Sequence, residues 1–495
     1  MINLLRKRTK KYLDISLKGQ ELFNHLIEEG YFPEAWVLPP FLQVKLETAG
    51  NGDMTTREKI SLFAPKSNMR WREFSLLHPN NYQDVCQKLS KDEYFNIVSK
   101  LSNGSKIFGY SVPLGFKDRT ERIENQIREW SELQEDLMNY TNEYPFILIA
   151  DISNCYHSMY THAIEWACEK AGYKTYGTEL DKSIRRGMNN RTHGLPVGPA
   201  ITDYVAEIVL YAIDREIEKE LKDKNYIAGR FRDDYFFLCK TKAEAEDILK
   251  GVAVCLRIYH QSINSEKTRI VDSNFYFNNF WRIDFQLLVQ QFGFENLDKR
   301  TVKVNTRKLE SFIGLVLRLS NSLNHERAVI DLALDLLLKI RPDSKKAYPR
   351  YFNLVTRMYQ GRIPALSRIL LLLFELANEN RECDVKFKQF LLNRFRVASN
   401  LYDEFEVLWI VYFMSQKQYK YRDGNDIYKI LDRSGFILSK IIVSYYKNAL
   451  SNRRRTGDLT NKLYNAINNS KMNIVYSDVK GLEETVKLLH IKLFY

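Results

Sequence analysis

The residues with the clearest chemical potential are three aspartates that follow strand-like segments. Asp151 comes directly after Phe146–Ala150 (FILIA), a short apolar run with the profile of a buried strand. Asp233 and Asp234 lie between two aromatic runs in Tyr226–Cys239 (YIAGRFRDDYFFLC), a pattern that predicts a hairpin with a charged turn. Adjacent carboxylates flanked by residues that favour burial are unfavourable unless a cation neutralises them. The pattern therefore predicts a divalent metal site, and a solvated Asp-Asp turn is the alternative.

The chemistry that such carboxylates support is phosphoryl transfer. Mg²⁺ binds through one or two carboxylates together with substrate phosphates, and it keeps several waters. Two such ions about 4 Å apart activate an attacking hydroxyl and stabilise the leaving oxygen. We therefore expect two Mg²⁺ ions, or Mn²⁺ in their place, at the aspartates.

A glycine-containing loop lies between the first aspartate and the other two. Thr192–Pro199 (THGLPVGP) precedes a helical pattern over Tyr204–Leu221. Glycines let a backbone approach a flat partner such as a base or a sugar. A Gly-Pro helix start with no ligand is the other explanation.

Composition narrows the class of protein. The 495 residues include 74 Lys plus Arg against 61 Asp plus Glu, which gives a net charge of +13 and favours polyanionic partners such as nucleic acid or nucleotides. With 45% hydrophobic and 27% charged residues, wholesale disorder is excluded. No run reaches the roughly 18 apolar residues of a membrane span, and the first residues do not resemble a signal peptide. Six scattered cysteines without a CxxC pair argue against zinc and disulfides and favour a reducing cytosol.

The texture of the chain predicts two domains. Residues 1–300 mix strand and helix patterns, which indicates an α+β layer structure, whereas residues 301–495 are expected to be all helical. Helical segments open near Glu326, Pro364 and Tyr402, a spacing of about 38 residues with another helix inside each interval. That approximates the two-helix period of HEAT-like repeats, and an irregular helical domain is the alternative.

Four segments, in this order, resemble motifs A to D of reverse transcriptases. They are FILIADISNCYHSMYTHAIEWA from Phe146, THGLPVGPAITDYVAEIVLYAID from Thr192, RFRDDYFFLC from Arg230 and INSEKTRI from Ile263. DISNxYHSxYTH followed by THGLPxG resembles most closely the abortive-infection (Abi) polymerases of bacterial phage defence. Upstream, residues 64–72 (APKSNMRWR) resemble the basic fingers segment of that family, and GYFPEAWVLPPF resembles the extended N-terminal element of prokaryotic reverse transcriptases.

The resemblance implies a palm and fingers polymerase domain followed by a HEAT-like helical domain. It further implies template-independent DNA synthesis from dNTPs, primed by a protein hydroxyl, so that a single-stranded DNA product stays covalently attached. It also implies that the protein assembles into closed trimers or hexamers in the bacterial cytoplasm and has no membrane partner. Three departures are notable: Phe231 replaces the common tyrosine of the YxDD box, Arg232 is its variable residue, and Val197 replaces the usual glutamine of motif B. The last suggests an altered contact with template or nucleotide.

Site residues follow from the motif positions. Asp151 and Asp233 would hold both metals with help from the Ile152 carbonyl, and Asp234 would add negative charge nearby. Tyr156 falls at the steric-gate position, where a bulky ring would clash with a ribose 2′-hydroxyl; a packed tyrosine without that role is the alternative.

Further residues are expected at the nucleotide. Lys66, Arg70 and Arg72 of the fingers segment would neutralise the triphosphate. Gly198 would lie against the nucleotide. Lys267 of motif D would protonate the pyrophosphate leaving group. For priming we select Tyr12, which follows a strongly basic stretch, rather than Tyr31, whose ring belongs to a fold motif.

Two other functions remain open on the sequence. One is a template-dependent reverse transcriptase that copies a specific RNA. The other is a non-catalytic nucleic-acid-binding scaffold with a decayed palm, against which the three acidic positions argue.

Overall fold

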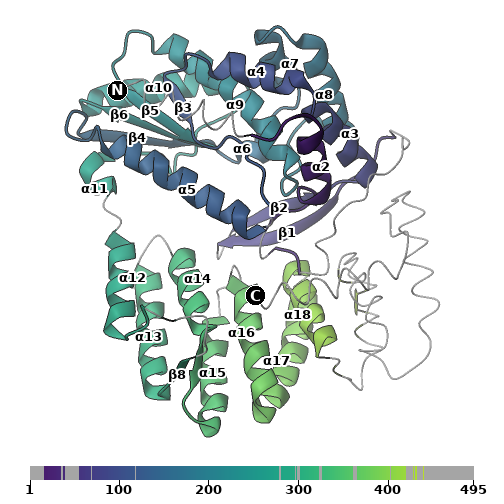
Figure 1. Cartoon of the computed structure of the whole chain (residues 1–495), viewed down its shortest axis with the longest axis vertical. Coiled ribbons are helices and arrows are strands. Elements are labelled where there is room, and N and C mark those ends of the chain that lie inside the picture. Colours follow the sequence, from purple (N-terminus) through teal and green to yellow (C-terminus); the bar gives the residue numbers. More distant parts are fainter. Residues whose placement is uncertain are drawn as a thin grey trace.

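A computed structural model describes most of the first 417 residues of the chain. The described residues are 16–34, 37–39, 55–67, 70–117, 119–277, 280–295, 297, 302–322, 326–359, 365–401, 403–417 and the single positions 419, 427, 430, 431 and 439. A mixed sheet with its helices forms one half of the molecule, and a row of helices forms the other (Figure 1).

The central sheet has five strands in the order β3-β5-β6-β4-β7. Their bounds are β3 Ile107–Gly109, β4 Phe146–Asp151, β5 Ile227–Phe231, β6 Asp234–Cys239 and β7 Arg269–Asp272. The apolar run before Asp151 is β4, and the two aromatic runs form the β5–β6 hairpin, as the sequence predicted. β6 pairs antiparallel with both β5 and β4, and β3 pairs parallel with β5.

Each face of the sheet is covered by helices. On one face lie α9 (Ile201–Glu220) and α10 (Lys242–Ile258), and the Tyr235 hydroxyl of β6 donates to Asp214 of α9 at 2.7 Å. On the other face lie α5 (Arg119–Met138) and α11 (Ser273–Phe277). Alternation along the strand turns the neighbouring Phe236 to this second face. The face of each strand residue therefore follows from its position in the register.

The segment before the sheet forms a hairpin and a helical layer. β1 (Ile60–Ser67) and β2 (Arg70–Leu76) pair antiparallel, with a register shift between Pro65 and Ser67. Alternate residues such as Leu62 and Phe74 are buried, while Phe63 and Trp71 are exposed on the opposite face. The helices of this half are α2 Gly19–Glu28, α3 Pro79–Leu89, α4 Asp92–Ser102, α6 Cys155–Ser158, α7 Ala163–Lys170 and α8 Lys174–Arg186.

Beyond the sheet the described residues are mainly helical. The helices are α12 Phe280–Gln291, α13 Thr306–Ser322, α14 Glu326–Leu337, α15 Tyr348–Tyr359, α16 Leu366–Glu379, α17 Arg381–Asn400 and α18 Glu404–Gln416, with the short strands β8 Val302–Val304 and β9 Ile340–Pro342. Helices begin at Glu326, Leu366 and Glu404, close to the expected openings; Pro364 and Tyr402 themselves lie outside the described residues. Assignment to HEAT-like repeats stays a prediction, as does a domain boundary at residue 300.

The helical half packs against the β1–β2 half of the molecule. Trp409 of α18 donates its indole N–H to the Val37 carbonyl at 3.2 Å. Within the described residues, no helix has both the length and the apolar character that a membrane span requires.

Candidate active site

The three aspartates meet at one end of the sheet. Asp151 ends β4 and lies directly opposite Asp234, the first residue of β6. Asp233 occupies the two-residue turn between β5 and β6, and its carbonyl accepts the Ile152 N–H at 3.1 Å. Directly opposed residues of antiparallel strands project to the same face, so Asp151 and Asp234 share the face covered by α5. The sequence prediction that these carboxylates converge is in agreement with this register.

Burial and mutual repulsion disfavour the ionised form of these carboxylates. Asp151 is 2% exposed. Burial, and then the Asp151 carboxylate, raise the pKa of Asp233. Burial, followed by Asp233 and Asp151, raises the pKa of Asp234 to about 8. The site therefore favours protons or a cation at neutral pH.

Lys267 supplies one positive charge to this edge. Its ammonium forms an ion pair with the Asp151 carboxylate and is 42% exposed. The backbone N–H of Asn264, in the same turn, donates to the Asp151 carbonyl at 2.8 Å and fixes the turn beside β4. Because an all-oxygen carboxylate set with raised pKa values suits a hard divalent cation, the residues present fit Mg²⁺ or Mn²⁺. Asp151 and Asp233 would hold the ions, with Asp234 beside them.

Tyr156 lies next to the hairpin turn, at the wall of a cavity. Its carbonyl accepts the Leu195 N–H at 2.6 Å, which joins the Asp151 segment to the THGLP loop. Burial, and then the nearby Asp203 carboxylate, raise the pKa of the Tyr156 phenol well above its usual range. The cavity wall includes Ser111, Arg122, Glu129, Tyr156, Asp203 and Arg232. Tyr156 therefore lies beside the hairpin turn that carries Asp233, and its role as a steric gate stays a prediction.

A buried network beneath the turn was not predicted from the sequence. The Arg230 guanidinium, with no exposed surface, donates to Asp214 at 2.9 and 3.1 Å and to Glu207 at 3.0 and 3.2 Å. It also donates to the Arg232 carbonyl at 3.2 Å. Ser111 accepts the Arg232 N–H at 2.8 Å and donates to Glu207 at 2.7 Å. The backbone N–H and carbonyl of Arg232 are therefore both hydrogen-bonded to this buried network.

This network explains how a left-handed residue is maintained beside Asp233. Arg232 has φ of 54°, a conformation that costs a non-glycine residue about 1 kcal/mol or more. A signal was present in the sequence: Arg230 interrupts an apolar strand, and two acids, Glu207 and Asp214, are seven residues apart on one helix. Residues at that spacing share a helix face, so a buried ion-pair network could have been proposed.

The other predicted site residues are distributed around this edge. Arg72 is exposed on β2. Lys66 and Arg70 fall within β1 and β2, and their side chains lie outside the described residues, as does Tyr12 altogether. Tyr31 is buried and donates its hydroxyl to the Leu77 carbonyl at 2.5 Å, which confirms it as a packed residue.

Gly198 has a structural reason to be glycine. Its φ is 117°, and a Cβ at this position would lie 2.4 Å from the Phe32 ring. The ring belongs to the GYFPEAW segment, so the loop and that segment pack directly together. A contact between Gly198 and a nucleotide stays a prediction.

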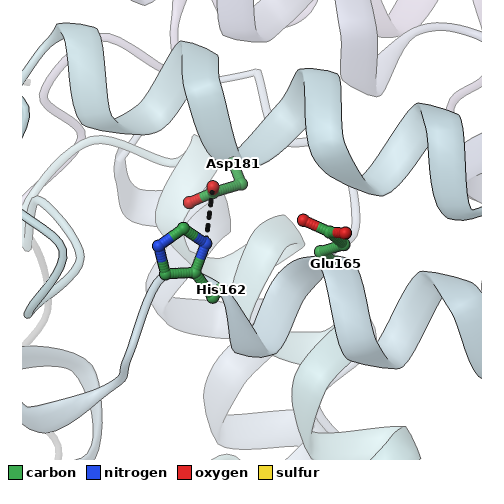
Figure 2. A group of neighbouring side chains, drawn as sticks. All are labelled: His162, Glu165 and Asp181. Carbon is green, nitrogen blue, oxygen red and sulfur yellow. Dashed lines mark ion pairs between the residues drawn. The ribbon is translucent and has the colours of Figure 1, made fainter.

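A second group of side chains among the described residues has the spacing of a candidate metal site. Ligand atoms of His162, Glu165 and Asp181 lie within 4.8 Å of one another where α7 meets α8 (Figure 2). Asp181 is already engaged, because it pairs with His162 at 3.1 Å and accepts from Arg185 at 3.0 and 3.1 Å. These contacts account for the cluster as a link between two helices, and we assign no ion to it.

Comparison with protein families agrees with the motif assignment at the level of the domain. Residues 94–304 match the family described as reverse transcriptase (RNA-dependent DNA polymerase). A search of curated proteins gave no match. Among solved structures, telomerase from Candida albicans in complex with a TWJ fragment of telomeric RNA is similar over 68% of this chain and 64% of its own, with 12% identity and a TM-score of 0.31. The match thus spans less than two thirds of the telomerase chain. Residues 94–304 are a reverse-transcriptase-type polymerase domain.

Replacing Asp233 with asparagine is expected to remove metal binding and nucleotide incorporation while the fold persists. Loss of one ligand charge should lower incorporation by about 10²–10³-fold or more. Calorimetric titration with Mn²⁺ measures the binding directly. Because only ionised carboxylates bind the ion, binding should strengthen as the pH rises towards the Asp234 pKa of about 8. Asp247→Asn, an exposed carboxylate on α10, is the control; near-wild-type Mn²⁺ binding by Asp233→Asn would contradict the assignment.

Ser111→Ala is expected to loosen the turn that carries Asp233. The change removes the acceptor of the Arg232 N–H, so the Mg²⁺ concentration for half-maximal activity should rise severalfold. Ser183→Ala removes a comparable buried hydroxyl, bonded to the Glu179 carbonyl at 3.0 Å on α8. Both variants should lose about 1 kcal/mol of stability in thermal unfolding. An equal Mg²⁺ requirement in both would show that the Ser111 contact does not position the turn.

Proposed function

We propose that this chain is a template-independent DNA polymerase of bacterial antiphage defence that transfers nucleotides from dNTPs to a hydroxyl of the protein itself. The polymerase domain at residues 94–304 supports nucleotidyl transfer. The observation that carries the untemplated reading is the position of α5 on the sheet face from which Asp151 and Asp234 project.

The cover that α5 provides is close to the carboxylates. Phe231 lies directly opposite Asp234, and the Trp130 ring of α5 packs against it with centroids 5.3 Å apart. Trp130 also contacts Phe236, two residues along β6, at 5.5 Å. Further down β5, a Cβ on Gly229 would lie 2.4 Å from Leu133 of α5, so helix and strand are in close contact. Figure 1 shows α5 running along the sheet on the side of the helical half.

This cover limits what can lie beside the aspartates. A template–primer duplex is held through its phosphates and grooves over an extended surface, and that surface has to include the edge where the reaction occurs. Because α5 packs on the carboxylate face, we propose that a single strand or a protein segment, rather than a duplex, approaches the aspartates. The geometry therefore favours untemplated addition over copying of an RNA.

The residues of the site divide the work as follows. Bound metal ions would activate the attacking hydroxyl and neutralise charge on the transferred phosphate. Asp151 and Asp233 would supply the ligand oxygens, and Asp234 would add a negative charge beside them once a bound cation has displaced its proton. Lys267, half-exposed beside Asp151, can give a proton to the departing pyrophosphate. Basic fingers residues, of which Arg72 is exposed, would bind the triphosphate.

Priming requires a hydroxyl that can reach the aspartates. Tyr12 remains our proposal for it, since six Lys or Arg against one Asp in the first twenty residues would draw this arm to phosphates and carboxylates. Assembly into a closed trimer or hexamer in the cytoplasm, with the attached single-stranded DNA as product, belongs to the same proposal.

Tyr156→Ala is expected to relax discrimination against NTPs, because the clash with the ribose 2′-hydroxyl disappears. The ratio of dNTP to NTP incorporation should fall by about tenfold or more. Tyr156→Phe keeps the bulk of the ring and should keep the selectivity. An active Tyr156→Ala enzyme with unchanged selectivity would remove the steric-gate role.

A homopolymer template separates the two kinds of polymerase. RNase-treated protein is incubated with Mg²⁺, poly(rA)·oligo(dT) and one labelled dNTP at a time, then run on a denaturing gel. We expect label in the protein band, with dNTPs other than dTTP accepted and no dependence on the duplex. Label confined to oligo(dT), and only with dTTP, would establish a template-dependent reverse transcriptase instead. Tyr12→Phe tests the primer separately, because normal labelling of this variant removes Tyr12 and leaves the polymerase assignment intact.

A further inference from the structure

A groove between α15 and α17 lies outside the polymerase domain. The two helices contact each other in the helical half (Figure 1). The groove encloses about 460 Å³, within the range of ligand sites in proteins. All of its lining residues come from these two helices.

The lining presents hydrogen-bond donors and positive charge. Arg357 of α15 and Lys386 of α17 line the groove together with the side-chain amides of Asn353, Gln389 and Asn393. Among the described residues that form the lining, none is acidic. The nearest carboxylate to Lys386 is the well-exposed Glu382 at 3.5 Å, a surface pair that is worth little.

Arg394, the third cation of the groove, is neutralised by a buried carboxylate. Arg394 donates to Glu406 at 2.7 and 2.9 Å, and Glu406 is 1% exposed. The Arg394 guanidinium also lies 4.8 Å from the centre of the Tyr359 ring. This internal pair gives the groove a rigid floor, so the net positive charge at its mouth comes from Arg357 and Lys386.

Aromatic rings complete the surface. Phe352, Tyr359 and Phe390 contribute to the lining, and Phe390 packs edge-on against Tyr359 with centroids 5.2 Å apart. Phe390 is only partly buried, so part of its ring is available to a ligand. Half-exposed rings beside cations stack on unpaired bases, which a duplex does not offer.

Charge is concentrated on the same two helices. α15 has two arginines and no acid, and α17 has five basic residues against two acidic ones. Cations, neutral amides and the partly exposed ring of Phe390 together suit a chain of phosphates with splayed bases. An acidic peptide would leave the ring and the amides without matched partners.

We propose that the α15–α17 groove binds single-stranded DNA, so that the helical half holds the strand that leaves the polymerase domain. This deepens the proposed function and rests on it for the identity of the strand. Binding itself does not require synthesis, and it can be measured on protein that cannot extend DNA.

The experiment measures the affinity of full-length protein carrying Asp233→Asn for a fluorescein-labelled oligo(dT), by anisotropy over a range of salt concentrations. Adding Arg357→Glu and Lys386→Glu should weaken binding by about tenfold or more and lower the salt slope by about 1.4, as expected for two lost phosphate contacts. Lys303→Glu with Arg307→Glu is the matched control, since it reverses the same two residue types at exposed positions on β8 and α13. Arg357→Gln with Lys386→Gln gives a milder version, and circular dichroism verifies that each variant is folded.

The outcomes are distinct. A loss confined to the groove variants supports the proposal. An equal loss in the control, or an unchanged affinity in both groove variants, overturns it, because general attraction to a basic protein then explains binding. Competition by poly-glutamate as effective as that by oligo(dT) also overturns it. Failure of the protein to add dNTPs would refute the proposed function and leave this binding result as it stands.

Discussion

The central constraint on this molecule is the negative charge gathered at the end of β4 and β6. Burial disfavours the charged form of Asp233 and Asp234, and repulsion from the neighbouring carboxylates adds to this effect, so the pKa values of both groups are raised. Two sets of contacts hold this edge in place. Lys267 pairs with Asp151 on the exposed side, and the buried Arg230 network holds the turn from below. A divalent cation would complete this balance, which is why the same arrangement that is unfavourable for the empty fold suits metal-dependent chemistry.

The Arg230 network itself is nearly self-neutralising. One guanidinium faces two carboxylates, and burial raises the pKa of Asp214 to about 7, so a proton on Asp214 can make up the difference. Breaking one partner of such a buried set is far more damaging than its net contribution suggests. This gives the turn a support that is independent of the metal. It also explains how Arg232, a non-glycine residue, keeps a left-handed backbone next to Asp233.

The elements that carry the three aspartates could be predicted from the sequence, and their surroundings could not. Local sequence patterns predict these elements: an apolar run predicts β4, and two aromatic runs with a charged turn predict the β5–β6 hairpin and place the three aspartates at strand ends. The position of α5 is a different kind of information, because an amphipathic helix shows that one face is buried without showing what it is buried against. Gly198 is similar, since its glycine is required by Phe32, a ring from a distant segment. The α15–α17 groove also depends on how two helices pack together, so the sequence of either helix alone does not reveal it.

The central claim is that this edge builds DNA onto the protein without a template, and intact-protein mass spectrometry tests it most directly. RNase-treated protein is incubated with Mg²⁺ and a single dNTP and then denatured, and its intact mass is measured. The account predicts a ladder above 58.5 kDa whose steps equal one deoxynucleoside monophosphate, absent from Asp233→Asn. A mass that stays at that of the unmodified chain, in a preparation that extends an annealed primer by the template's sequence, would contradict it.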